Sequence, residues 1–354
     1  MRPRIVWGSA VAAAAILTSA GRAQDGMYVH DEPWFPPNAR ACQSSPSLFA
    51  GTDLLYLKPY ISNNSAFTAV GASSETEPFD WQHTRAHRIW IGYAEPSGWG
   101  VRAQGFVFDD SSDSWHVTLT RAEITTRQIS APPFDSVIPV VAGFGAPSAV
   151  LGRAGLGEDR LTFRSDLRIV SADVEATFAC GTDDWTVRFS GGGRYLELRH
   201  GYRAELENNG EFGTSETQNL NLNRDFTGYG PTLALFARHR IGDTALSAYA
   251  SARGSLVVGT LDEQATFARS VNDPDLLAGV GRRQTRANAV SSADHTIPVA
   301  ELEMGLECSG ALGRMRLFGR AGVVAQTYFN AGSATGSTGS LTMLGALVTV
   351  GFGF

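Results

Sequence analysis

The chain has 354 residues, of which 18% are charged and 10% aromatic, with a formal net charge of −6 at pH 7. Its length suits one large all-β domain or two ordinary domains, and its 39 glycines favour a fold with many strands and turns. The acidic balance argues against nucleic-acid binding, which needs a basic face. Three cysteines without metal-ligand spacing imply neither a metal site nor a cofactor.

The amino terminus predicts export. A basic start precedes an apolar run over residues 5–17 and a small-residue stretch over residues 18–23, which is the order of a cleavable secretory signal. The run is shorter than the roughly 20 residues of a membrane-spanning helix. We expect cleavage after Ala23, with Ala20 as the alternative, which leaves 26 basic against 35 acidic residues. Residues 24–47 hold four prolines and no periodicity, so they are expected to form an irregular periplasmic leader.

Beyond the leader, ten segments alternate apolar and polar residues with the period of a β-strand. They cover residues 48–58, 84–94, 98–109, 164–179, 185–199, 224–240, 243–259, 295–309, 313–328 and 341–354. Their connections alternate strictly between long and short, as in an up-and-down antiparallel transmembrane β-barrel of the outer membrane, with short periplasmic turns and long outer loops. An even count places both termini on the periplasmic side. A soluble sandwich is the alternative, but it has no reason to segregate loop lengths in this way.

The longest outer loop is predicted over residues 110–163. Within it, residues 115–128 could extend the third strand or form another hairpin, so the barrel is expected to have about 10 strands, within a range of roughly 8 to 12. The apolar stretch from Val137 to Leu151 is either a collapsed outer loop or an inward constriction of the lumen.

The last segment predicts how the wall closes. Its alternate residues from Leu344 to Phe354 form one apolar row, which the final strand of a membrane barrel must present to lipid. This strand is expected to seal the sheet against residues 48–58. Val350, Phe352 and Phe354 are expected to form the signal that meets the barrel-assembly machinery.

Each strand should alternate lipid-facing and lumen-facing positions. In residues 185–199, Trp185 and Tyr195 bracket an apolar outer row, while Arg188 and Arg194 fall on the inner row. Because charges cannot face lipid cheaply, the same alternation predicts a mixed-charge lumen. Its predicted lining is Asp53, Arg88, Arg102, Asp173, Glu175, Arg188, Arg194, Arg253, Glu301, Glu303, Arg316 and Arg320, with Glu307 on the same row. These charges either line a narrow aqueous channel and set its ion preference or fill a small lumen as cross-strand ion pairs.

Five strand segments carry a family resemblance: GTDLLYLKP (51–59), RIWIGYAEPSGWGVRAQGFVFD (88–109), WTVRFSGGGRYLEL (185–198), FTGYGPTLALFARHRIG (226–242) and YASARGSLVVG (249–259). They resemble the Legionella-type major outer membrane protein family, pore-forming barrels that also occur in planctomycete-like bacteria. The resemblance covers most of residues 48–354 and implies an outer-membrane β-barrel described as pore-forming. It transfers no substrate residue, and residues 110–163 have no counterpart in it.

The leading functional prediction is a porin-like barrel that lies in outer-membrane lipid and passes small solutes or ions. The alternative is a structural or surface-interaction barrel with a filled lumen. An enzyme is disfavoured, because the seven histidines are scattered without a recognisable nucleophile spacing and are expected on solvated surface. Cys180 and Cys308 fall at periplasmic strand ends far apart around the wall, so at most one disulfide, involving Cys42, is expected.

Overall fold

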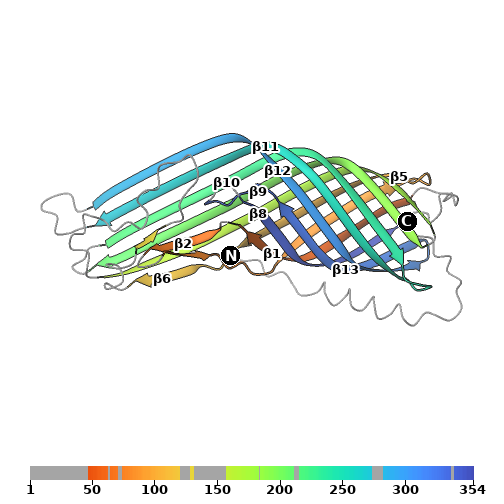
Figure 1. The fold of residues 1–354 in the computed structure, drawn as a ribbon, viewed down its shortest axis with the longest axis horizontal. Coiled ribbons are helices and arrows are strands. Elements are labelled where there is room, and N and C mark those ends of the chain that lie inside the picture. The colour runs from red at the N-terminus through yellow and green to blue at the C-terminus, as the bar shows by residue number, and fades with distance from the viewer. Residues whose placement is uncertain are drawn as a thin grey trace.

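Ten antiparallel strands form a closed barrel in the computed structural model, which describes residues 47–62, 64–70, 74–119, 128–130, 157–182, 184–210, 215–272, 282–335 and 339–354 (Figure 1). The barrel strands are β1 (Ser47–Ile61), β4 (Thr84–Ala94), β5 (Trp99–Ser111), β8 (Gly157–Gly181), β9 (Trp185–Gly210), β10 (Ser215–Arg240), β11 (Leu246–Asn272), β12 (Arg282–Leu312), β13 (Met315–Tyr328) and β14 (Leu341–Gly353). Each pairs with its neighbours in chain order, and the pairing of β1 with β14 completes the ring. The predicted up-and-down barrel is confirmed.

Four shorter strands lie beyond the ring. β6 (Trp115–Leu119) pairs with β8, and β2 (Ser65–Val70), β3 (Ser74–Pro78) and β7 (Gln128–Ser130) form a separate sheet. The prediction of an irregular loop over residues 110–163 was therefore wrong at its ends, which form strands. The predicted signal, nearly all of the leader and the stretch from Val137 to Leu151 lie outside the described residues. Within the described ranges, no helix has the length and apolar character needed to cross a membrane.

The last strand closes the wall as predicted. β14 pairs with β1 from Phe49 opposite Gly353 to Ile61 opposite Leu341. The backbone N–H of Phe354 extends this seam by donating to the carbonyl oxygen of Leu48 at 2.9 Å. The apolar row that includes Phe354 faces outward and is exposed, whereas the alternate row faces the lumen and is buried.

Deleting Phe354 is expected to reduce barrel assembly, because it removes one seam hydrogen bond and one lipid-facing aromatic side chain. Together these contribute about 2 kcal/mol. The folded fraction after refolding, measured by heat-shifted gel mobility, should fall. Phe329→Ala is the control, because this exposed side chain lies at the opposite end of the barrel. Equal folded fractions for the deletion and the unaltered chain would contradict an assembly role.

Short turns connect the strands at the end where β1 begins and β14 ends. They connect Ala94 to Trp99, Gly181 to Trp185, Arg240 to Leu246 and Leu312 to Met315. Gly98, Gly242 and Gly313 have φ angles of 90°, 57° and 62°, a backbone region that glycine enters without a steric penalty. These turns match the short periplasmic connections expected from the sequence, and they define the periplasmic end of the barrel.

The outward face of the wall changes character at one level. Tyr195 of β9, Tyr229 of β10 and Val258 of β11 are opposite one another in the ladder, and all three are exposed. The next outward positions on these strands are polar: Glu197, Thr227 and Thr260. A strand from Trp185 to Tyr195, tilted by about 40°, rises by roughly 25 Å, which is the height of the apolar band of an outer-membrane barrel. Tyr195 and Tyr229 therefore mark the boundary of the lipid-facing band that is farther from the periplasm.

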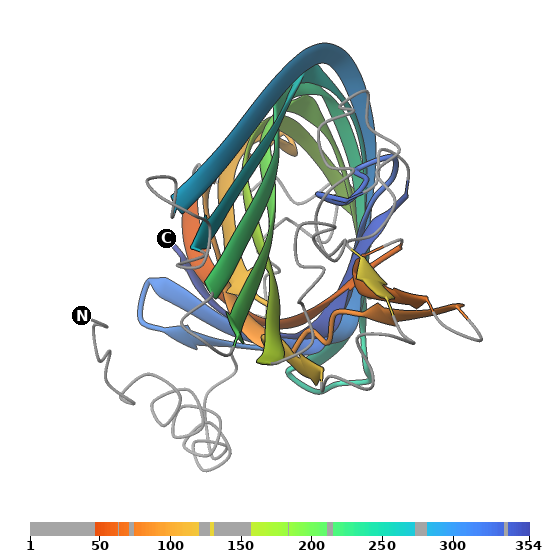
Figure 2. The same cartoon turned by 90° about the vertical axis from the view of Figure 1, so that its left-hand side faces the viewer.

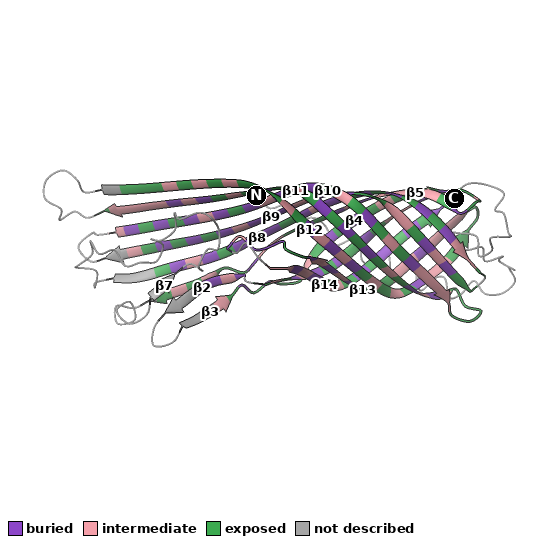
Figure 3. Ribbon diagram, turned by 45° about the horizontal axis from the view of Figure 1, so that its top comes forward, coloured by how far each residue is buried: buried purple, intermediate pink, exposed green. Residues whose placement is uncertain are grey.

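The inward face changes character at the same level, but in the opposite sense. Below Tyr195 the inner row of β9 carries Arg188 and Arg194, whereas above it the row is Leu196, Leu198, His200, Tyr202, Ala204 and Leu206. Strands β8 to β12 thus continue beyond the membrane with polar and charged residues outside and mostly apolar residues inside, apart from inward ion pairs such as Arg224–Glu263. Buried and exposed residues alternate along these strands (Figure 3). From Glu197 to Gly210, β9 extends by about 45 Å. We call this part the outer extension.

One prediction about the outer loops was wrong, because the segments concerned form strands of the outer extension. The polar segments 205–223 and 260–294 were expected as long outer connections, but most of their residues belong to β9, β10, β11 and β12. Only residues 211–214 and 273–281 separate these strands. A strand with polar outward residues and apolar inward residues has the ordinary pattern of a water-exposed sheet. The alternation therefore persists in the outer extension, but the polar and apolar residues have exchanged faces.

Candidate functional site

A layer of charged side chains crosses the lumen within the membrane. We define this ionic layer by its members: Asp53, Arg88, Arg102, Gln104, Asp173, Glu175, Arg188, Arg194, Arg238, Arg253, Glu301, Glu303, Glu307 and Arg320. It contains eleven of the twelve charged residues predicted for the lumen. Arg316 is the exception: it lies on the periplasmic side, where its Nη2 donates to the Ser309 hydroxyl at 3.1 Å.

Several ion pairs of the layer join directly opposite residues on neighbouring strands. Asp173 on β8 faces Arg194 on β9 in the ladder, and the Arg194 Nε lies 2.6 Å from a carboxylate oxygen of Asp173. The same relation holds for the pairs Asp53–Arg88, Arg102–Glu175 and Glu307–Arg320. These pairs form because both residues of each pair face inward and the register of the two strands places them opposite each other.

Other ion pairs span the lumen between strands that are not neighbours. Arg253 of β11 contacts Asp173 and Glu175 of β8 at 2.5 and 2.7 Å. Arg194 of β9 contacts Glu301 of β12 at 2.5 Å. Further bridges join Arg88 of β4 to Glu303 of β12, and Arg238 of β10 to Glu307. Because these side chains meet across the interior, the lumen is filled at this level.

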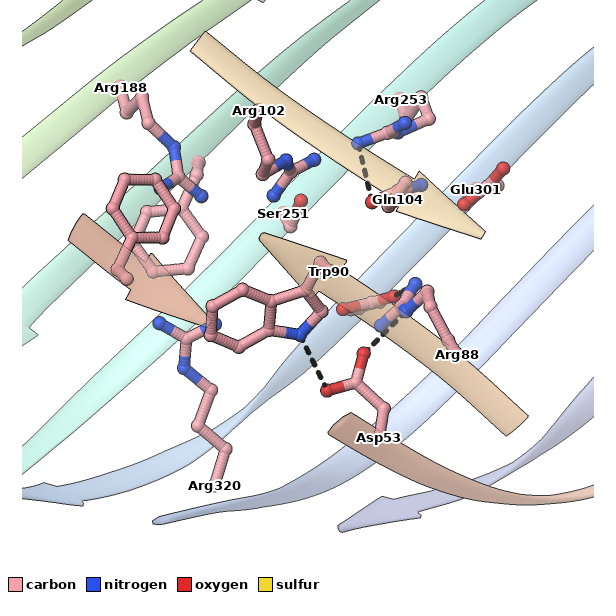
Figure 4. Close-up of a pocket in the computed structure, with 13 residues that line it drawn as sticks. Asp53, Arg88, Trp90, Arg102, Gln104, Arg188, Ser251, Arg253, Glu301 and Arg320 are labelled. Carbon is pink, nitrogen blue, oxygen red and sulfur yellow. Dashed lines mark hydrogen bonds and ion pairs between the residues drawn. The ribbon is translucent and has the colours of Figure 1, made fainter. Parts of the chain in front are cut away.

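A small cavity remains within the ionic layer (Figure 4). Water-sized molecules have about 40 Å³ available there, which exceeds the roughly 10–15 Å³ needed to hold one water. Phe49, Trp90 and Phe236 line it together with charged residues of the layer. The sequence prediction missed Gln104, Arg238 and the aromatic residues, although each falls on an inward position of its strand.

An apolar core occupies the lumen on the outer side of the ionic layer. All ten barrel strands contribute buried side chains to one continuous cluster, which we call the outer core. Representative members are Leu55 of β1, Phe108 of β5, Ile169 of β8, Val257 of β11 and Met343 of β14, each with 0% exposure. Because side chains from every barrel strand are fully buried here, the described residues leave no wide aqueous channel through the lumen at this level.

The connection between β1 and β4 packs into the outer core. The Phe67 ring stacks on Phe163 of β8 with centroids 5.1 Å apart, and Phe79 meets Tyr202 of β9 edge-on at 5.9 Å. The Tyr202 hydroxyl donates to the carbonyl oxygen of Ala66 at 2.9 Å. The two ends of this connection therefore lie against the inner surface of the outer extension. The orange strands β2 and β3 between them project to one side of the barrel (Figure 2).

A buried serine–histidine contact in the outer extension does not have the geometry of a nucleophile and its base. His200 Nε2 lies 2.8 Å from the Ser165 hydroxyl, and His200 Nδ1 accepts the backbone N–H of Ala334 at 2.9 Å. An accepting Nδ1 leaves the ring proton on Nε2, so the histidine donates to the serine. The serine hydroxyl then donates to the carbonyl oxygen of Gly201. The prediction of solvated histidines was wrong for His200, which is 2% exposed.

Acid is expected to destabilise the outer extension through His200. Burial, assisted by the positive charge of Arg224, lowers the pKa of His200 to about 3. The unfolded state binds a proton below about pH 6.5 and the folded state does not, so stability is full above that pH and falls as the pH drops towards 3. Near pH 5 the loss is about 2 kcal/mol.

Amide hydrogen exchange between pH 7 and 4.5, corrected for intrinsic rates, should show this loss in residues 196–206 of β9. His200→Gln is the control, because its side chain has no proton to gain in that range, and its exchange should depend less on pH. Equal pH dependence in both proteins would contradict a role for His200.

The described cysteines, histidines and acidic residues form neither a disulfide nor a metal site. Cys180 and Cys308 are not bridged, and Cys42 lies outside the described residues, so the single disulfide with Cys42 stays a prediction. Among the described residues, no cluster of three or more His, Cys, Asp or Glu side chains is placed to hold a metal ion.

Comparison with known proteins gives one family match. Residues 42–346 match the family model described as Legionella pneumophila major outer membrane protein precursor. The comparison with curated proteins gave no match.

Similar solved structures include the outer membrane protease OmpT from Escherichia coli, at 9% identity and a TM-score of 0.37, over 87% of this chain and 96% of that one. The Ralstonia pickettii toluene transporter TbuX is similar at 8% identity and a TM-score of 0.27, over 87% and 89% of the two chains. A Pseudomonas aeruginosa FadL homologue is similar at 8% identity and a TM-score of 0.26, over 90% and 94%.

Proposed function

Because the chain belongs to the family of the Legionella pneumophila major outer membrane protein and forms an outer-membrane β-barrel, we propose that it is a porin-like pore of narrow, ion-scale bore that the outer core closes at rest. One observation carries this proposal: the lumen has a layer of charges around a water-sized cavity within the membrane. On the outer side of this layer, one continuous cluster of apolar side chains fills most of the lumen.

The charges are costly if they only support the wall. Removing carboxylates and guanidinium groups from water costs several kcal/mol per ion, which pairing only partly offsets, and ionisable residues at membrane depth commonly mark ion pathways. A barrel that needed only a filled lumen could continue the apolar pattern of Ile169 and Val257 towards the periplasm. The ionic layer therefore supports passage of small ions or solutes rather than a purely structural interior.

Conductance of the purified mature protein in a planar bilayer tests this proposal. We expect discrete, small and infrequent steps, because the outer core must be displaced before ions reach the ionic layer. A control preparation that has been heat-unfolded should give none. Silence of the folded protein, together with silence of a variant whose outer core is weakened, would contradict the pore.

A structural or surface-interaction barrel is the second candidate, and the outer extension favours it. Five strands, β8 to β12, leave the membrane with a charged outer face, such as Arg199, Arg203 and Glu205 on β9. Shortening the β9–β10 and β11–β12 hairpins to the level of Tyr195 separates the two functions. A surface role should be lost in that variant, whereas a pore should persist or conduct more. We propose no enzymatic role.

A further inference from the structure

We propose that the cavity of the ionic layer is a binding site for a small monovalent inorganic anion of halide size, which makes anions the preferred permeant class. The second part of this inference rests on the proposed pore, whereas the site itself does not.

The cavity lining carries more positive than negative charge. Five arginines contribute to it, Arg88, Arg102, Arg188, Arg253 and Arg320, against three carboxylates, Asp53, Glu301 and Glu303. The three carboxylates are already engaged: Asp53 and Glu303 both contact Arg88, and Glu301 contacts Arg194. Three of the arginines are engaged as well, because Arg102 and Arg253 contact Glu175 and Arg320 contacts Glu307. The ionic layer as defined above holds seven arginines against six carboxylates. Because buried charge is costly unless it is offset, this excess of one positive charge favours a monovalent anion in the space that remains.

The excess charge is concentrated on one side of the cavity. Arg188 and Arg320 both lie over the ring of Phe236, each with its guanidinium carbon 4.9 Å from the ring centroid. Arg102 lies beside them, with the Ser251 hydroxyl close by, whereas Asp53 and Glu301 lie on the opposite side (Figure 4). Like charges that line one buried cavity repel one another, and an anion in the cavity would offset that cost. The guanidinium N–H groups and the hydroxyl supply hydrogen-bond donors.

The volume selects the class of anion. About 40 Å³ accommodates the centres of only a few water-sized species, so a small inorganic anion such as a halide fits and a large organic anion does not. The carboxylates around Arg88 repel a multivalent anion more strongly than a monovalent one. The geometry points to bromide or chloride as suitable probes.

Bromide titration of the refolded mature protein in detergent tests the site without requiring conduction. The midpoint of thermal unfolding is measured as sodium bromide replaces sodium gluconate at constant ionic strength. We expect bromide to raise the midpoint and Arg188→Gln to shift half-saturation to about tenfold higher bromide, as for loss of one charge-assisted hydrogen bond. Arg188→Lys, which keeps the charge, should recover part of the effect. Arg316→Gln is the matched control, because Arg316 faces the lumen outside the cavity.

Equal bromide dependence for Arg188→Gln and the unaltered chain, or an equal effect of gluconate, would overturn the site. Reversal potentials in a salt gradient test the permeant class separately, and we expect anion preference that Arg188→Gln reduces. Bromide binding without conductance would keep the site and overturn the pore. Conductance with cation preference would overturn the assignment of anions as the permeant class.

Discussion

Replacing Asp173 by asparagine is expected to destabilise the barrel by about 3–5 kcal/mol, the largest effect of any single substitution in the ionic layer. Asp173 is 1% exposed and accepts hydrogen bonds from three side chains: Arg194 at 2.6 and 2.9 Å, Arg253 at 2.5 Å and Gln104 at 2.6 Å. Asparagine keeps the shape but removes the charge, which leaves two buried guanidinium groups with less compensation. Loss of one partner from a buried ion pair costs more than the pair contributes.

Asp166→Asn is the matched control for this substitution. Asp166 lies on the same strand, β8, and pairs with Arg164 at 3.1 Å, but both side chains are about half exposed in the outer extension. Exposed pairs contribute roughly 0–1 kcal/mol, so this variant should unfold like the unaltered chain. Urea unfolding of the refolded barrel, followed by tryptophan fluorescence, measures both. Similar midpoints for the two variants would show that Asp173 does not hold the layer together.

The membrane-spanning wall was predictable from the sequence because lipid imposes a strict rule on it. The alternation that places Trp185 and Tyr195 outward and Arg194 inward holds in the structure, and the strand order that follows from short turns brings Asp173 opposite Arg194. Beyond the membrane that rule no longer applies. In the outer extension the alternation keeps the period of two, but the polar Glu205 faces outward and the apolar Leu206 faces inward. The outer extension was therefore predicted as loops.

The lumen contents were only partly predictable, for a different reason. Alternation identifies which residues face inward, such as Arg253 and Glu175, but it does not say whether side chains on opposite walls reach each other. That depends on barrel diameter and stagger, which a ring of ten strands determines only when it closes. The contact of Phe67 with Phe163 depends in addition on a loop that folds back onto the wall, and neither residue carries a local signal of that return.

Weakening the outer core is expected to increase ion conductance through the barrel. Phe67 and Phe79 belong to the β1–β4 connection, are 5% and 6% exposed, and fill the interior against Phe163 and Tyr202. Replacing both by alanine removes two aromatic rings from the lumen, and each truncation costs the core about 3–5 kcal/mol. The ring of strands itself does not depend on them, because its ladder runs through the backbone of β1 to β14.

The double variant should therefore still show heat-shifted gel mobility, yet open more often or to a larger conductance level in planar bilayers. Tyr60→Ala with Phe329→Ala is the control, since it removes two aromatic rings that are exposed rather than buried in the lumen. If bromide carries most of the increased conductance, and if adding Arg188→Gln reduces that conductance, then the outer core and the ionic layer lie in series on one ion path. A folded double variant with unchanged conductance would show instead that the outer core supports the extension and does not close a pore.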